Sequence, residues 1–169
     1  HTPLKVHYLR WGGFNPSKNH LDSMSKYLEE EVLATEITTI KRLEANLQIM
    51  QPEVIVCHSL GARVLYHAAT EGISFGSVRK IVLLQPDIPV GYDMSALKAT
   101  LASQKIELIY TWCPWDDTLA MVSFFAKELR LGQIPFVQNL PAKFNPLIPR
   151  IGKTWHTQIL DQDITHLLF

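Results

Sequence analysis

The sequence predicts an α/β protein with a mainly parallel sheet and helices on both of its faces. Short apolar runs alternate along the chain with stretches in which apolar residues recur at helical spacing. The run "RKIVLLQPD" at 79–87 is continuously apolar, as strands are when both sheet faces are covered. At "VIVCHSLGARVL" an apolar strand runs straight into a helix-like pattern. Alternation of this kind favours parallel pairing, here of about five or six strands.

Five segments are predicted to be strands, and a brief extended piece is expected near 33–37. The strands are residues 4–9, 54–57, 79–87, 105–112 and 134–141. The last is weaker because its prolines favour an edge position.

Helices are predicted between these strands from apolar spacing and from start and stop residues. The first runs through Leu21, Met24, Leu28 and Val32 after the start signal Asn15-Pro16-Ser17, and the second covers 40–50 and ends at Gln51-Pro52. The third extends from about Leu60 to Glu71, and the fourth from Asp93 through Ser103. The fifth runs through Leu119, Val122, Phe125 and Leu129 and stops at Gly132, and a final helix begins near Asp161. The Pro-rich residues 141–149 are expected to form a loop.

Length and composition narrow the classes of function. The 169 residues predict a single domain, 1–169. Sixteen basic and sixteen acidic residues cancel, which argues against nucleic acid or anionic lipid as partner. No apolar run is long enough to span a bilayer. Two cysteines form no disulfide framework or metal-ligand pattern, so a reduced, cytoplasmic setting and no metal are expected. The opening "HTPLKV", without Met, and the apolar ending "DITHLLF" suggest that terminal sequence is absent.

Ser59 is the first candidate functional residue. It follows the strand 54–57 directly, and a sharp strand-to-helix turn would hold its hydroxyl above the sheet edge. Small neighbours are needed there; Gly61 meets this need, and Cys57 stands where glycine is usual. A serine that only caps the next helix is the simpler alternative. The complete strand–turn–helix pattern favours a nucleophile.

A serine nucleophile needs a base and a carboxylate, which in this arrangement follow in the order Ser, acid, His. Asp116 and Asp117 follow the strand 105–112, and we expect one to cap the next helix and the other to turn inward. Asp117 is preferred as the acid and Asp116 is the alternate. His156, in the loop before the last helix, is preferred as base over His166.

The oxyanion of an acyl intermediate needs two donors. The backbone N–H of Leu60 is expected to supply one donor. The other is expected from the glycine pair after the first strand, as the N–H of Gly13 or of Phe14. Aromatic residues near the predicted strand ends could line an apolar pocket or could equally be core; these are Trp11, Phe14, Trp112, Trp115 and Trp155.

With these residues in place, the chain resembles a compact α/β-hydrolase without a large lid. "VIVCHSLGARVL" is similar to the nucleophile elbow of that superfamily, typically "GHSLGG" or "AHSMG", and "IVLLQPDIP", "DDTLAMVSFFAKELRLG" and "WHTQIL" extend the likeness over most of 50–169. The pattern is similar to that of small bacterial serine hydrolases of the esterase or lipase type. It implies ester or related acyl hydrolysis through an acyl-serine, on a small-molecule substrate and without a cofactor.

A second hypothesis is a non-catalytic binding protein on the same scaffold. The usual His-Gly before the oxyanion loop is replaced by Arg10-Trp11-Gly12-Gly13, and fold alone confers no activity. Hydrolysis and acyl transfer to a partner are not distinguished by the sequence.

Overall fold

The computed structural model describes residues 20–135, 140–144 and 155–169. In this part of the chain, four strands form one sheet in sequential order, and all three pairings are parallel. The strands are β1 Val54–His58, β2 Lys80–Leu84, β3 Glu107–Trp112 and β4 Ala142–Phe144. The predicted α/β class with a parallel sheet is confirmed. Five or six strands are not seen in the described part, and the predicted strand 4–9 lies outside it.

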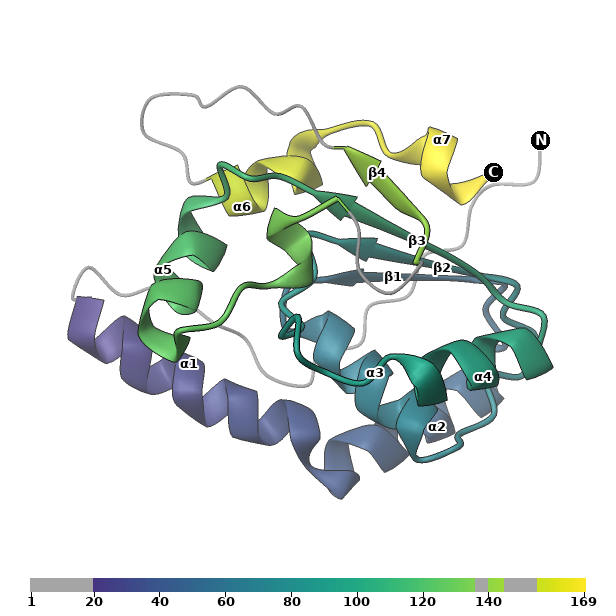
Figure 1. Ribbon diagram of the computed structural model, residues 1–169. Coiled ribbons are helices and arrows are strands. Elements are labelled where there is room, and N and C mark those ends of the chain that lie inside the picture. Colours follow the sequence, from purple (N-terminus) through teal and green to yellow (C-terminus); the bar gives the residue numbers. More distant parts are fainter. Residues whose placement is uncertain (1–19, 136–139, 145–154) are drawn as a thin grey trace.

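The described helices lie around this sheet (Figure 1). They are α1 His20–Thr35, α2 Ile37–Met50, α3 Gly61–Thr70, α4 Ser95–Ser103, α5 Asp117–Ala126, α6 Trp155–Gln158 and α7 Thr165–Leu168, with 3₁₀ turns η1 Leu131–Gln133 and η2 Ile159–Asp161.

Alternate residues of β2 show that both faces of the sheet are covered. Ile81 and Leu83 belong to the main core, which they share with residues of α2, α3 and α4. Val82 and Leu84 pack instead with Ile159 and with Leu167 of α7. Figure 1 shows the same division, with α6 and α7 on the opposite side of the sheet from α2, α3 and α4. This two-sided burial is the reason for the continuously apolar sequence of β2.

The prediction of an extended piece near 33–37 is wrong. The helix α1 continues to Thr35, only Glu36 leaves the helical conformation (φ −69°, ψ 135°), and α2 begins at Ile37. The buried side chain of Ala34 faces the protein in this last turn of α1, so tertiary packing outweighs the weak local preference there.

Three predicted boundaries toward the carboxyl end also differ. The helix α5 ends at Ala126 rather than near Gly132, because Lys127 adopts a left-handed conformation (φ 54°) and its N–H caps the Ser123 carbonyl. β4 lies in the stretch expected to be loop, while Ile134 and Pro135 are not in a strand and 136–139 are outside the described residues. Short elements α6, η2 and α7 replace one final helix.

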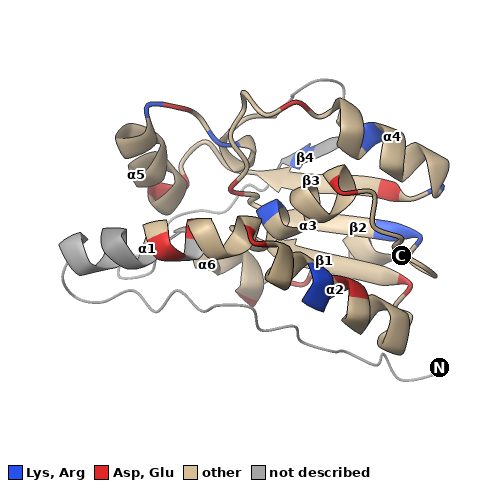
Figure 2. Cartoon of the chain, turned by 90° about the horizontal axis from the view of Figure 1, so that it is seen from below, with Lys and Arg blue, Asp and Glu red and all other residues tan. Residues whose placement is uncertain are grey.

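Charged side chains lie mainly on the helices and loops of the described chain, with both signs interspersed and the strands largely free of them (Figure 2). None of the helices described is long and apolar enough to cross a membrane.

Candidate active site

Ser59 occupies a strained turn between β1 and α3. Its φ of 53° lies in the left-handed region, which is unfavourable for residues other than glycine. Backbone hydrogen bonds hold it there: its N–H donates to the Leu84 carbonyl (3.1 Å), and its carbonyl accepts from the N–H groups of Asp87 (3.1 Å) and Ala62 (3.0 Å). The end of β2 thus fixes the turn from outside the local sequence. Strain maintained by the surrounding structure is frequent at functional sites.

Leu60 follows this turn at the N-cap of α3, and its side chain is buried. The first N–H groups of a helix have no acceptor within the helix and carry partial positive charge. The Leu60 amide is therefore at a position suited to an oxyanion donor. The second predicted donor, Gly13, lies outside the described residues.

The structure pairs His156 with Asp116, not with Asp117. His156 Nδ1 donates to Asp116 Oδ2 over 2.6 Å, and both side chains are buried. Asp117, the preferred acid, is exposed, and its Oδ1 accepts from the N–H of the adjacent Thr118. The choice between the two aspartates is thereby corrected.

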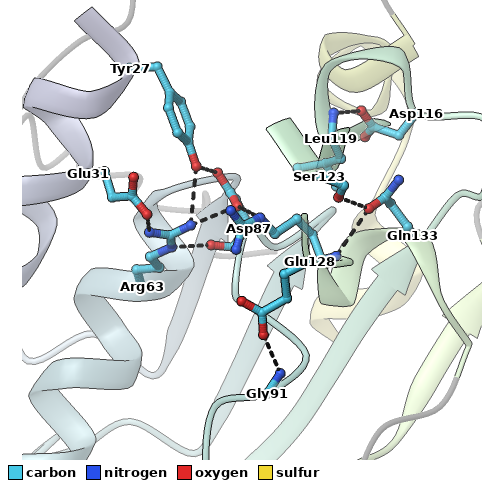
Figure 3. Close-up of polar contacts among 11 residues, drawn as sticks. Tyr27, Glu31, Arg63, Asp87, Gly91, Asp116, Leu119, Ser123, Glu128 and Gln133 are labelled. Carbon is cyan, nitrogen blue, oxygen red and sulfur yellow. Dashed lines mark hydrogen bonds and ion pairs between the residues drawn. The ribbon is translucent and has the colours of Figure 1, made fainter. Parts of the chain in front are cut away.

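The correction has a local cause. Asp116 is the N-cap of α5 with an extended backbone (φ −66°, ψ 106°), and its Oδ1 accepts from the N–H of Leu119 (2.8 Å). Figure 3 shows this cap. The other carboxylate oxygen remains available for His156. One aspartate thus performs the two tasks that the sequence analysis divided between two residues.

Gln85 is a third member of this cluster that the sequence analysis did not identify. Its Nε2 donates to Asp116 Oδ2 over 2.6 Å, and the residue is fully buried. It follows β2 with a φ of 44°, and its N–H donates to Thr111 Oγ1. The rule that sites form beyond the carboxyl ends of parallel strands could have singled out this polar residue after "IVLL".

The tautomer of His156 suits a general base. A proton on Nδ1 that is donated to a carboxylate leaves Nε2 of the neutral ring as an acceptor. Nε2 is buried and has no hydrogen-bond partner among the described residues. It therefore carries an unsatisfied lone pair that could accept a proton.

His166, the alternate base, lies at a different end of the sheet. It is exposed on α7, and Phe169, just beyond that helix, accepts a hydrogen bond through its carbonyl from Lys80. Lys80 begins β2, whereas Ser59 pairs with Leu84 at the end of that strand. The position of His166 does not favour a role at the Ser59 edge.

Ser59 and His156 lie at the same edge of the sheet. His58, which directly precedes Ser59, places its ring 4.6 Å from the His156 ring, between centroids. Its Nε2 donates to the His156 carbonyl over 2.9 Å. No hydrogen bond joins Ser59 to His156 in the part of the chain that is described. Catalytic hydrogen bonds are often long or poorly aligned before substrate binds, so the missing bond does not by itself argue against proton transfer between these residues.

A second buried carboxylate, Asp87, has partners of a different kind (Figure 3). Arg63 Nη2 and Arg130 Nε each approach Asp87 Oδ1 to 3.1 Å, and Tyr27 donates to Oδ2. Arg63 also bonds the Asp87 carbonyl and forms an ion pair with Glu31. Burial raises the pKa of the Tyr27 hydroxyl far above its usual range, and Asp87 adds to the effect. These contacts connect α1 and α3 to the loop after β2, and the N–H of Asp87 in that loop donates to the Ser59 carbonyl.

The predicted aromatic pocket is only partly described. Trp112 ends β3 and packs, partly buried, against the main core, while Trp115 is 55% exposed. Trp11 and Phe14 lie outside the described residues, and Trp155 begins α6. Within the described ranges, no group of three or more His, Cys, Asp or Glu side chains could hold a metal ion.

No family model matches the chain, and comparisons with curated proteins and with solved structures also give no match.

Proposed function

We propose that the protein is a serine hydrolase of α/β-hydrolase type that cleaves a carboxylic ester or a related acyl bond. The observation that carries the proposal is the buried His156–Asp116 hydrogen bond of 2.6 Å at the edge where the strained Ser59 turn lies. The chain order Ser59, Asp116, His156 matches the order expected for this arrangement. The resemblance of "HSLG" and its flanking strand and helix to a nucleophile elbow supports it further.

In the proposed reaction, Ser59 Oγ attacks the acyl carbon while His156 Nε2 takes its proton. Asp116 stabilises the imidazolium that forms, and the Leu60 N–H donates to the developing oxyanion. His156 then protonates the leaving oxygen as the acyl-serine forms. Water activated by the same imidazole releases the acid and restores Ser59.

Cys57 does not compete as nucleophile in this proposal. The thiolate is the reactive form of cysteine. Cys57 packs against the main core, and burial raises the pKa of its thiol to about 12. The thiol is therefore protonated near neutral pH.

The test combines covalent labelling with turnover. We expect a fluorophosphonate probe to label Ser59, and Ser59→Ala to remove both labelling and hydrolysis of a short p-nitrophenyl ester, a loss on the order of 10⁶ in kcat. Cys57→Ala is the matched control and should keep both. Turnover by Ser59→Ala at the wild-type rate would reject Ser59 as nucleophile.

A non-catalytic binding protein on the same scaffold is the second candidate. The observation in its favour is that no hydrogen bond joins Ser59 to His156 among the described residues. Labelling decides between the two: wild-type protein that is folded and never labelled by the probe would favour binding without catalysis.

A further inference from the structure

The imidazole of His58 makes two contacts with His156 and none of the proposed catalytic steps uses it. It is the last residue of β1, so its backbone is fixed by parallel pairing with Leu84. Its Nε2 lies 2.9 Å from the His156 carbonyl. Its ring packs against the His156 ring at 4.6 Å with an interplanar angle of 41°.

A carbonyl oxygen can only accept, so the hydrogen bond places a proton on His58 Nε2. His58 therefore hydrogen-bonds to the backbone of His156, while Asp116 hydrogen-bonds to Nδ1 of its ring. The helix α6 that carries His156 is only four residues long and cannot be rigid on its own. Two anchors from the sheet edge compensate for this short support.

We propose that His58 is a positioning residue that holds His156 in the orientation needed to exchange a proton with Ser59. This inference rests on the proposed hydrolase function for its effect on rate, but the contact between the two histidines stands apart from it. His58 acts through His156 and touches no reacting atom.

The electrostatics of the pair agree with this role. Burial, followed by the proximity of His156, lowers the pKa of His58 to about 4, against smaller opposing effects of the hydrogen bond to His156 and of Asp116. His58 is then neutral when His156 becomes positively charged in the transition state. A second cation beside the imidazolium would oppose that charge.

Two substitutions separate the hydrogen bond from the ring contact. His58→Phe keeps an aromatic ring and removes the donor, whereas His58→Gln keeps an N–H donor and removes the ring. We expect His58→Phe to lower kcat roughly ten- to a hundredfold, with KM nearly unchanged. This is the range observed when a residue that orients a functional side chain is removed. His58→Gln should recover most of the rate. His67→Phe is the matched control, because His67 is a partly buried histidine of α3 that packs with Tyr66 and Tyr92.

A double-mutant cycle tests whether His58 acts through His156. In a His156→Ala background, His58→Phe should cause no further loss of the residual rate. Additive losses, or a His58→Phe enzyme with wild-type kcat, would overturn the inference.

A spectroscopic measurement makes the inference independent of activity. The short His156–Asp116 hydrogen bond should give a far-downfield Nδ1 proton signal in the NMR spectrum, present in wild type and His58→Gln and broadened by exchange in His58→Phe. Nitrogen shifts of the unaltered protein should show His58 protonated at Nε2 near neutral pH. A protonated Nδ1 instead, or the same downfield signal in all three proteins, would refute positioning. If wild type neither labels nor turns over ester, the hydrolase proposal fails and this measurement alone decides the role of His58.

Discussion

Asp87 and Asp116 are both buried carboxylates at the carboxyl edge of the sheet, and they differ in their partners. Asp87 follows β2 and is surrounded by the guanidinium groups of Arg63 and Arg130 and by the Tyr27 hydroxyl. Asp116 follows β3 and accepts hydrogen bonds from a neutral amide of Gln85, a backbone N–H and an imidazole.

The difference in partners separates structure from chemistry. Arginine stays charged at every accessible pH, so Arg63 and Arg130 hold the chain at Asp87 but exchange no proton with it. Histidine gains and loses a proton near neutral pH, and a neighbouring carboxylate stabilises its charged form. A carboxylate at the end of a parallel strand is therefore insufficient evidence for a catalytic acid. The residue that pairs with the carboxylate indicates whether its role is structural or catalytic.

The largest expected effect concerns the choice between adjacent aspartates. Asp116→Asn should lower kcat by about 10⁴, because an amide can no longer stabilise the imidazolium or fix the correct tautomer of His156. Asp117→Asn is the matched control, and the exposure of Asp117 predicts a change of less than about twofold. Steady-state ester hydrolysis measures both. Equal losses, or a greater loss at 117, would contradict the comparison.

The next effect concerns Asp87 and is expected in stability. Asp87→Asn removes the carboxylate shared by the buried guanidinium groups of Arg63 and Arg130 and leaves Arg63 with only its Glu31 ion pair, which should lower the free energy of unfolding by about 3–5 kcal/mol. Turnover per folded molecule should change little, because the N–H of residue 87 and not its carboxylate bonds Ser59.

Urea denaturation and active-site labelling measure these two quantities. Glu53→Gln is the control: its ion pair with Arg79 is exposed, and its loss should cost below about 1 kcal/mol. An Asp87→Asn protein that is fully stable, or stable but inactive, would remove the distinction drawn between the two carboxylates.

The smallest effect is in the pH dependence of stability. The pKa of His58 is about 4 in the folded protein and near 6.5 in an unfolded chain, so the unfolded chain binds more protons between these values. Stability therefore falls as pH decreases through this window. From pH 7 to 5.5, His58 alone should remove about 1 kcal/mol of the free energy of unfolding. Denaturation of wild type and His58→Gln across this range should show the shallower dependence in the variant; identical slopes would contradict the lowered pKa.

Local patterns in the sequence were sufficient to predict the α/β class, the parallel strands and the strand-to-helix turn at Ser59. Apolar periodicity and helix start signals depend on neighbouring residues and are readable along the chain. The predictions fail where a distant segment decides: the end of α1, the position of β4 and the short helices α6 and α7 depend on which faces are buried.

The sequence by itself determined which residue types stand at the ends of the strands, and therefore which residues could form a site. Only the tertiary structure decided that Asp116 rather than Asp117 meets His156, and that Gln85 and His58 join them. The physical reason is that side-chain direction at a helix N-cap and the approach of residue 156 from 40 positions away depend on three-dimensional packing. Spacing along the chain carries no record of either.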